Sequence, residues 1–276
     1  MDRLSADESL RLVEGAYRTV PGGRSVPARI FPGARFYSRV VRIVWRAGRA
    51  ASRGNYDDEA WRRSSLDVFR AFERVGGVVE IEGVDRFSGI GGPCVFIGNH
   101  MSTLETFLLP SIIVPSKRVT FVVKRSLVEY PVFGHVMRSR DPIVVGRTNP
   151  REDLTEMFEG GARRLGEGIS IVVFPQTTRT EVFDPAAFNS IGIKLAKRAR
   201  VPVVPLALKT DAWGNGKFFK DFGRIDPARV AHFAFGEPLS VQGNGAADHL
   251  RVVEFILDKL RAWGGKAAPA PSSAGH

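Results

Sequence analysis

The sequence predicts an α/β domain whose largely parallel or mixed central sheet is flanked by helices, with an amphipathic helical region at its N-terminal end. Short apolar segments alternate with helical segments from about residue 78 onward, which is typical of βαβ units. The segment "GISIVVFP" is apolar almost without interruption, as in a strand covered on both faces. A chain of 276 residues, 43% of them hydrophobic, can bury one large core.

We expect residues 1–75 to form a helical, membrane-associating region. Residues 1–28 predict one short helix and a linker, and residues 34–50 and 59–74 predict two longer helices. In the helix over 34–50, arginines recur every three or four positions, next to an aromatic residue: Arg35, Arg39, Arg42, Trp45, Arg46 and Arg49. A basic amphipathic helix of this kind is typical of membrane-surface binding. A helix docked on the protein body with a solvated arginine face explains the pattern equally well.

Residues 76–263 are expected to form the α/β domain, and residues 264–276, which are small and Pro-rich, a disordered tail. The apolar segments predict strands over residues 77–85, 94–99, 119–125, 142–146, 168–175, 201–209 and 230–236. The amphipathic segments predict helices from about Ser102 and over residues 151–165, 188–199 and 247–263.

Charge and composition restrict the possible partners. The net charge of +11 predicts an anionic partner: nucleic acid, anionic lipid or a phosphorylated ligand. No zinc-finger, basic-zipper or aromatic-interleaved RNA motif is visible, so no nucleic acid is expected.

The single cysteine, Cys94, cannot build a disulfide framework or a cysteine-rich metal site, and no other segment has metal-ligand spacing. The N-terminal residues do not read as a secretory signal, and no apolar run is long enough to span a membrane.

The stretch "NHMSTLE" places His100 at the end of an apolar strand and Glu105 five positions later. Residues five apart do not share a helix face. They can meet if Ser102 caps a helix in which Glu105 is the third residue, because His100 then lies outside the helix and can fold back. A carboxylate that holds one imidazole nitrogen leaves the other free as a general base. Glu105 as a helix cap only, with His100 bonded to a loop, is the simpler explanation of this motif taken alone.

The order of several blocks resembles the lysophospholipid acyltransferase family, which includes the 1-acylglycerol-3-phosphate and glycerol-3-phosphate acyltransferases. These blocks are "NHMSTLE", "VKRSLVEYPVFG", "PIVVGR", "VVFPQTTRT" and "VPVVPLAL", and the resemblance covers residues 78–240. It implies that His100 deprotonates an acceptor hydroxyl, which then attacks an acyl thioester, and that Glu105 orients His100. The family usually has Asp where Glu105 stands.

The resemblance also implies a substrate-binding group that follows the strand ends: Lys124, Arg147, Gln176, Thr177, Thr178 and Arg179. Arginine binds phosphate through charge-assisted bidentate hydrogen bonds, and the carboxyl ends of strands gather ligand sites. Three positions depart from the family pattern: Glu105, Gly146 in place of an acid, and Gln176 in place of Glu.

The function expected from this resemblance is transfer of a fatty acyl group from acyl-CoA or acyl carrier protein to the hydroxyl of lysophosphatidic acid or a related lysolipid, in phospholipid biosynthesis. The expected location is peripheral, on the cytoplasmic face of a bacterial-type inner membrane, with no cofactor beyond the thioester cosubstrate and no metal. A non-catalytic lipid-binding or membrane-adaptor protein, or a hydrolase of the same fold, are the alternatives. Acyl length, donor type, acceptor headgroup and oligomeric state are not encoded in recognisable motifs.

Overall fold

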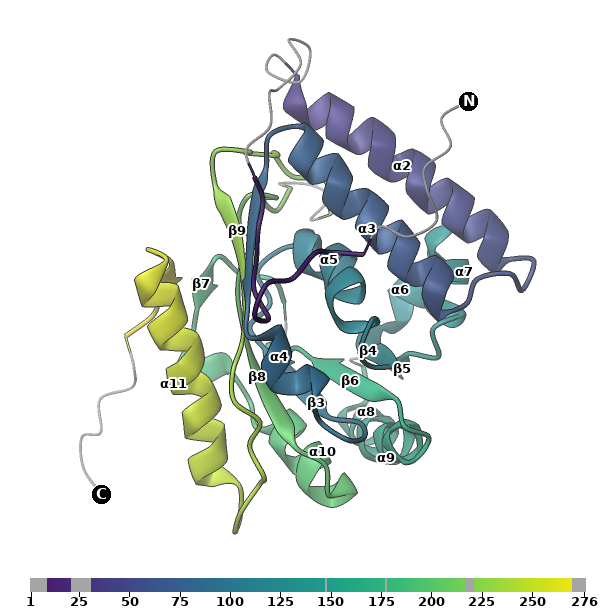
Figure 1. Ribbon diagram of the computed structural model, residues 1–276. Coiled ribbons are helices and arrows are strands. Elements are labelled where there is room, and N and C mark those ends of the chain that lie inside the picture. Colours follow the sequence, from purple (N-terminus) through teal and green to yellow (C-terminus); the bar gives the residue numbers. More distant parts are fainter. Residues whose placement is uncertain (1–8, 21–30, 147, 177, 217–220, 270–276) are drawn as a thin grey trace.

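A central mixed sheet covered by helices on both faces organises the protein (Figure 1). The computed structural model describes residues 9–20, 31–146, 148–176, 178–216 and 221–269. Within them, eight strands lie in the order β1-β2-β9-β8-β3-β6-β4-β5. They are β1 (Tyr17–Arg18), β2 (Val78–Glu82), β3 (Val95–Gly98), β4 (Val119–Lys124), β5 (Ile143–Val145), β6 (Ser170–Val173), β8 (Val203–Lys209) and β9 (Val230–Phe235). The predicted α/β fold, a central sheet flanked by helices, is confirmed.

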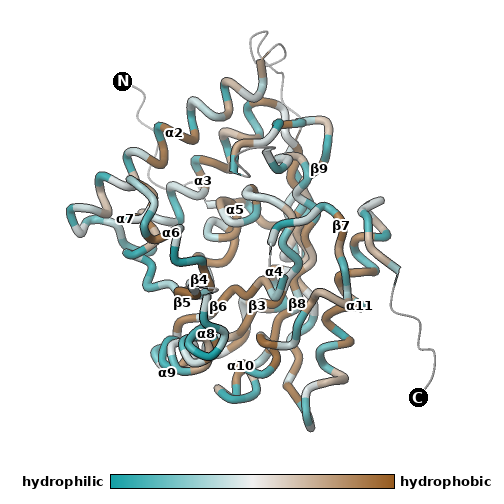
Figure 2. Tube along the Cα trace, turned by 180° about the vertical axis from the view of Figure 1, so that it is seen from behind, coloured by the Kyte–Doolittle hydropathy of each residue, from teal (hydrophilic) through white to brown (hydrophobic). Residues whose placement is uncertain are grey.

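Strands β8, β3, β6, β4 and β5 run parallel, so their carboxyl ends lie at one edge of the sheet. Strand β9 is antiparallel to β8 and parallel to β2, and the edge strand β1 is antiparallel to β2. The central strands β3, β6 and β8 are apolar (Figure 2). Strand β6 is buried throughout, as the uninterrupted apolar segment predicts, whereas β2 alternates between buried and half-buried residues.

One face of the sheet is covered by α3 (Asp58–Arg74) and α5 (Thr103–Ile113), and α2 (Pro32–Ala51) packs on α3 (Figure 1). The other face is covered by α9 (Gly161–Gly166), α10 (Ile191–Ala199) and α11 (Ala246–Ala262). The residue alternation of β3 serves both layers: Phe96 joins the first core, and Val95 and Ile97 join the second.

Shorter elements complete the description. The helices are α4 (Val84–Ser88), α6 (Arg125–Glu129), α7 (Phe133–Arg138), α8 (Pro150–Thr155), a π-helical turn (Glu156–Gly160) and a 3₁₀ turn (Pro185–Ala187). The remaining strands are β7 (Val182–Phe183) and β10 (Lys266–Ala267). The predicted helix over 151–165 is thus interrupted by one π-helical turn between α8 and α9.

Two local predictions do not hold within the described residues. The helix expected within residues 1–28 is absent from the described residues 9–20, where Tyr17–Arg18 form β1, because pairing with β2 gives this segment hydrogen-bond partners that the short apolar pattern could not reveal. The disorder expected from residue 264 does not hold for Lys266–Ala267, which pair with β7. Residues 1–8, 21–30 and 270–276 lie outside the described residues.

Candidate active site

The chain turn between β3 and α5 positions the candidate catalytic pair, as the sequence predicts. Ser102 is the N-cap of α5 and accepts a hydrogen bond from Leu104 N–H at 3.1 Å. Glu105, the third helical residue, accepts in return from Ser102 N–H, which completes the capping box. His100 therefore lies just outside the helix, after the strand end.

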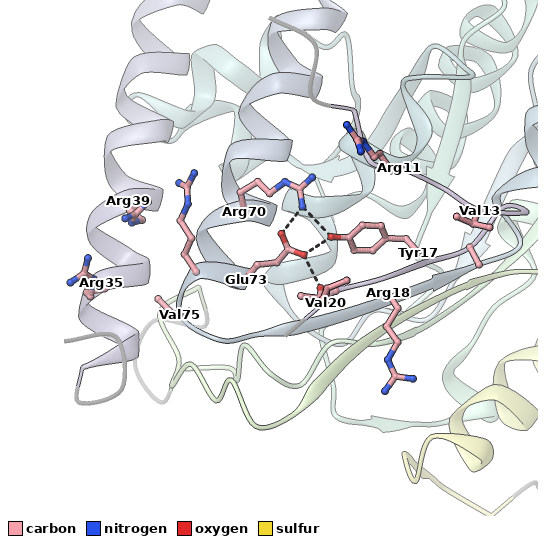
Figure 3. A pocket seen from close by; sticks show the side chains of 13 residues that line it. Arg11, Val13, Tyr17, Arg18, Val20, Arg35, Arg39, Arg70, Glu73 and Val75 are labelled. Atoms are coloured by element: carbon pink, nitrogen blue, oxygen red, sulfur yellow. Dashed lines mark hydrogen bonds and ion pairs between the residues drawn. The ribbon is translucent and has the colours of Figure 1, made fainter. Parts of the chain in front are cut away.

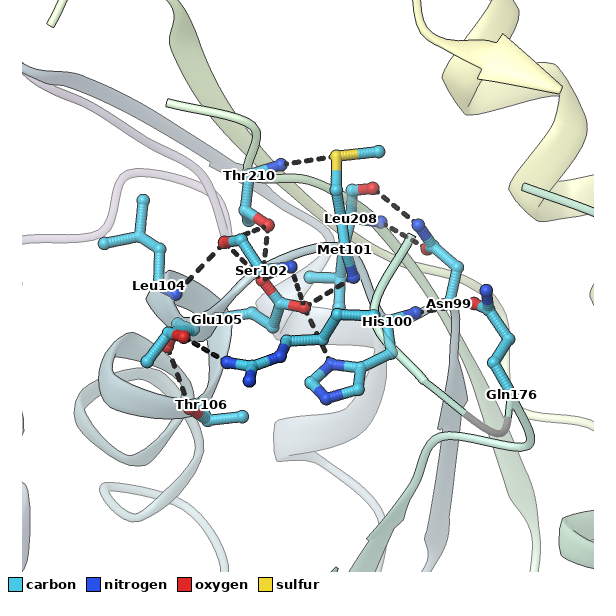
Figure 4. Close-up of polar contacts among 12 residues, drawn as sticks. Asn99, His100, Met101, Ser102, Leu104, Glu105, Thr106, Gln176, Leu208 and Thr210 are labelled. Atoms are coloured by element: carbon cyan, nitrogen blue, oxygen red, sulfur yellow. Dashed lines mark hydrogen bonds and ion pairs between the residues drawn. The ribbon is translucent and has the colours of Figure 1, made fainter. Parts of the chain in front are cut away.

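The imidazole of His100 meets the carboxylate of Glu105, with 2.9 Å between Nδ1 and Oε1 (Figure 4). The Glu105 side chain is fully buried, and the His100 side chain is 20% exposed. Because an ionised carboxylate only accepts hydrogen bonds, Nδ1 carries a proton, and in the neutral imidazole Nε2 then has the free lone pair. The neutral ring can therefore accept a proton at Nε2 from a molecule that reaches that nitrogen.

Glu105 receives more hydrogen bonds than a cap requires. Its oxygens accept from Met101 N–H at 2.7 Å, from the N–H and Oγ–H of Ser102 at 2.9 to 3.0 Å, and from the hydroxyl of Thr210. Burial by itself raises the pKa of the Glu105 carboxyl. The hydrogen bond and charge of His100, followed by the hydrogen bonds of Thr210 and Ser102, bring that pKa below its ordinary value. Glu105 is thus held as a buried anion beside His100.

The segment after β6 holds His100 from the other side. Gln176 accepts a hydrogen bond from His100 N–H at 2.7 Å, and Thr180 N–H donates to the His100 carbonyl at 3.0 Å. The imidazole stacks on the ring of Phe174, with centroids 4.4 Å apart and planes 5° apart. The side-chain oxygen of Gln176, a predicted substrate contact, therefore positions the backbone of His100 in this structure.

Arg179 lies next to this pair. Its guanidinium donates to the hydroxyl of Thr103, at the start of α5, and forms a 2.7 Å ion pair with Asp221. The Arg179 side chain is 17% exposed. An anionic substrate that uses Arg179 would compete with Asp221 for the same guanidinium.

The other predicted substrate-binding residues are placed as follows. Lys124 ends β4 with an exposed side chain and lies opposite Val145 of β5. Thr178 is exposed. Arg147 and Thr177 lie outside the described residues. Gly146 stands where the family pattern has an acid. Its N–H donates to the carboxylate of Asp153 at 2.6 Å, so an acidic side chain from α8 lies beside this position.

The arginine stripe divides along α2. Arg35 and Arg39 are half-buried, whereas Arg42, Trp45, Arg46 and Arg49 are exposed. Among the exposed group, the guanidinium of Arg49 lies 5.5 Å from the ring centroid of Trp45. In the described part of the chain, no helix is both long and apolar enough to cross a bilayer.

Three neighbours of the pair were not predicted from the sequence. Thr210 follows β8 and contacts Glu105, and Asp221 pairs with Arg179. Asn99, within the quoted "NH" motif, donates to the Leu208 carbonyl and accepts from Leu208 N–H, which ties the end of β3 to β8. Only Asn99 lies in a recognisable motif; Thr210 and Asp221 are more than 100 residues from the helix cap in the sequence.

The comparisons with known proteins concern the family and the fold. Residues 78–209 match the acyltransferase family model. The chain is 28% identical over 171 residues to a 1-acyl-sn-glycerol-3-phosphate acyltransferase of Pseudomonas aeruginosa, covering 62% of each protein. It is 28% identical over 158 residues to a 1-acyl-sn-glycerol-3-phosphate acyltransferase of Cocos nucifera, covering 56% of this chain and 48% of the relative. The alignments thus span less than two thirds of these relatives.

The fold is also that of a solved structure, the 1-acyl-sn-glycerophosphate (LPA) acyltransferase PlsC from Thermotoga maritima. The TM-score is 0.64 at 19% identity, covering 87% of this chain and 98% of that one. Sheet, strand-end histidine and matched region together define an α/β domain of the acyltransferase type. The matched region and the named relatives support the lysophospholipid acyltransferase family that the sequence blocks resemble.

Proposed function

We propose that this protein is an O-acyltransferase that moves a fatty acyl group from a thioester to the hydroxyl of lysophosphatidic acid or a related lysolipid. The observation that carries the proposal is the His100–Glu105 contact, in which Glu105 engages Nδ1 of a partly exposed imidazole. The names of the relatives support a 1-acylglycerol-3-phosphate as acceptor. Acyl-CoA and acyl carrier protein are the thioesters that the family resemblance implies as donors.

In the proposed reaction, Nε2 of His100 removes the acceptor hydroxyl proton as the oxygen attacks the thioester carbonyl carbon. The tetrahedral intermediate then loses its thiolate, which takes the proton back from the imidazolium, so an ester and a thiol leave the site. The buried Glu105 anion stabilises the transient imidazolium and fixes the ring orientation. No enzyme-bound acyl group is needed, because the acceptor itself is the nucleophile.

We assign substrate binding to the residues that the family resemblance implies: Lys124, Arg147, Gln176, Thr177, Thr178 and Arg179. Arg179 is the best supported of them, since its guanidinium lies beside Thr103, two residues from Glu105. Its present partner, Asp221, is an acid that a phosphate could replace. The complete His–Glu pair gives no support to a non-catalytic role.

We further propose that the enzyme works at an anionic membrane surface, where its lipid substrate resides. The exposed residues of α2 support this location: Arg42, Trp45, Arg46 and Arg49. Basic side chains near an anionic bilayer and an interfacial tryptophan favour peripheral binding. The cytoplasmic face of a bacterial inner membrane fits a phospholipid-synthesis enzyme.

The test is acyl transfer by purified protein with acyl-CoA and acyl carrier protein donors and lysophosphatidic acid as acceptor. His100→Ala should lower the rate about 100- to 10,000-fold, the usual contribution of a general base. His135→Ala is the matched control, since His135 is exposed on α7 and contacts Arg138 instead. Equal rates for His100→Ala and wild type would reject His100 as the base, and thioester loss without acylated lipid would indicate a hydrolase.

A further inference from the structure

A pocket of about 1030 Å³ lies between β1, α2 and α3, and arginine dominates its lining. Figure 3 shows Arg35 and Arg39 on α2, and Arg70 and Glu73 on α3, around it. The six arginines of the lining are Arg11, Arg18, Arg35, Arg39, Arg70 and Arg74. None of the lining residues belongs to the site around His100, so the pocket is separate from the proposed chemistry.

The single acid in the lining, Glu73, already has three hydrogen-bond partners within the pocket. It accepts hydrogen bonds from Tyr17 at 2.5 Å and Thr19 at 2.8 Å, and it pairs with Arg70 at 2.7 Å. Outside the lining, Glu80 pairs with Arg18 at 3.2 Å. No described carboxylate lies within salt-bridge distance of the remaining four arginines, Arg11, Arg35, Arg39 and Arg74. The pocket thus concentrates positive charge that the described residues do not neutralise.

The arginines also repel one another. Arg35 and Arg39 are four residues apart on α2, so they project from the same side of the helix. Partial burial, followed by the charges of Arg74, Arg35 and Arg42, lowers the pKa of the Arg39 guanidinium. A fold retains such a cluster at an electrostatic cost, and a bound anion would remove that cost.

Arginine clusters bind phosphate because each planar guanidinium can donate two parallel hydrogen bonds to its oxygens. A phosphomonoester carries close to two negative charges near neutral pH and three terminal oxygens, so it matches several arginines better than a phosphodiester with one charge. The carbon portion of such an ester can contact the apolar residues of the lining, Val13, Val20 and Val75. We propose that this arginine pocket binds a phosphomonoester dianion, at a site distinct from the acyl-transfer centre.

The same group can come from a lipid, as the headgroup of phosphatidic acid, or from a soluble ester. Binding of the 276-residue chain is measured without any acyl donor, first to glycerol 3-phosphate in solution. It is then measured to phosphatidylcholine vesicles that contain either phosphatidic acid or phosphatidylglycerol at matched surface charge. The variants are Arg39→Gln and Arg74→Gln, with Arg53→Gln as control, because exposed Arg53 follows α2 and does not line the pocket.

We expect the wild type to bind at least one of the two phosphomonoester probes, and each pocket variant to weaken that binding about tenfold or more, as loss of a charge-assisted hydrogen bond does. Arg53→Gln should leave it unchanged. A preference for phosphatidic acid over phosphatidylglycerol identifies a lipid source, and binding of glycerol 3-phosphate alone identifies a soluble one. The variants are expected to keep or raise the melting temperature, because each relieves repulsion.

Two results would overturn the proposal: neither phosphomonoester probe binds the wild type, or the pocket variants bind as wild type does. His100→Ala protein keeps the experiment independent of catalysis. It should bind the phosphomonoester like wild type even though it is inactive, so failure of the proposed reaction and failure of the pocket can be told apart.

Discussion

At the scale of single residues, the contacts of Glu105 show how this chain can use Glu where the family usually has Asp. The longer side chain reaches His100 with one oxygen and the hydroxyl of Thr210 with the other, while the amides of Met101 and Ser102 donate to it. One carboxylate therefore caps α5 and orients the imidazole at the same time. The capping role and the catalytic role, which compete as explanations of the sequence motif, are combined in one residue.

Thr210 should matter for catalysis although it does not contact substrate in the proposed mechanism. Thr210→Val keeps the volume but removes the hydroxyl that donates to the buried Glu105 anion, a bond worth about 1.5 to 3 kcal/mol. We expect kcat for acyl transfer to fall about tenfold with KM for the acceptor nearly unchanged, and Thr210→Ser to restore most of the rate. A parallel change in KM for both variants would instead indicate a general loss of structure.

Glu105 should also make stability depend on pH. Its pKa is lower in the folded protein than the value of about 4.3 expected in the unfolded chain, so the unfolded state binds more protons in this range. The contribution of Glu105 to stability is therefore complete above about pH 5 and is lost as pH falls through the folded pKa.

Glu105→Gln should therefore be less stable than wild type near neutral pH, and the difference should shrink as the solution is acidified. The measurement is the free energy of unfolding by urea at a series of pH values from neutral to acid. Gln also presents its amide group to N–H donors, so one hydrogen bond is replaced by repulsion. A constant difference across all pH values would show that the Glu105 charge is not linked to folding.

At the scale of elements, the arginine stripe of helix α2 contributes both to the arginine pocket and to the exposed outer face of the helix. The five arginines repeat every 3.5 residues on average, whereas an α-helix turns every 3.6, so the stripe drifts by about 20° per seven residues. The first members, Arg35 and Arg39, border the arginine pocket, and the later members, Arg42, Arg46 and Arg49, face outward. The inward face carries Phe36, Val40, Ile43 and Ala47.

The outward residues of α2 should determine membrane binding. Arg42→Gln combined with Arg49→Gln is expected to weaken binding to phosphatidylglycerol vesicles about thirtyfold at low salt, since each basic residue near an anionic surface contributes about 1 kcal/mol. Both variant and wild type should bind less as salt increases.

The control removes two exposed arginines from α11, Arg251→Gln with Arg261→Gln, and leaves the net charge equal to that of the α2 variant. Helix α11 lies on the face of the sheet opposite α2 (Figure 1). If both double variants bind equally weakly, then overall charge, and not α2, governs association with the vesicle.

At the scale of the whole molecule, an aromatic cluster joins the N-terminal helix to the active-site layer. The ring of Trp213, which follows β8, stacks on Phe107 of α5 and packs edge-on against Phe36 of α2, with centroids 5.7 and 5.0 Å apart. Tyr37 donates to the Gly223 carbonyl at 2.5 Å, and burial raises the pKa of Tyr37 to about 12. The proposed membrane-binding helix α2 thus contacts the segment that contains Asp221, the partner of Arg179.

Trp213→Ala should destabilise the protein by about 3 to 5 kcal/mol, because it removes a buried aromatic ring that packs against α2 and α5. The exposed Trp45 on α2 is the matched control, and Trp45→Ala should change stability by about 0.5 kcal/mol or less. Urea unfolding followed by circular dichroism compares the two. A small effect of Trp213→Ala would mean that α2 is only loosely attached to the domain.

The sequence by itself determined the alternation of strands and helices, the capping box at Ser102 and the meeting of His100 with Glu105, because periodicity and caps depend on neighbours a few residues apart. It could not reveal strands β1 and β10, since segments of two residues become strands only through a distant partner. Only the tertiary structure decided the contacts of Thr210 with Glu105 and of Asp221 with Arg179, and the arginine pocket between β1, α2 and α3. Those features join residues far apart in the chain, and no local pattern of side chains encodes which distant groups folding will bring together.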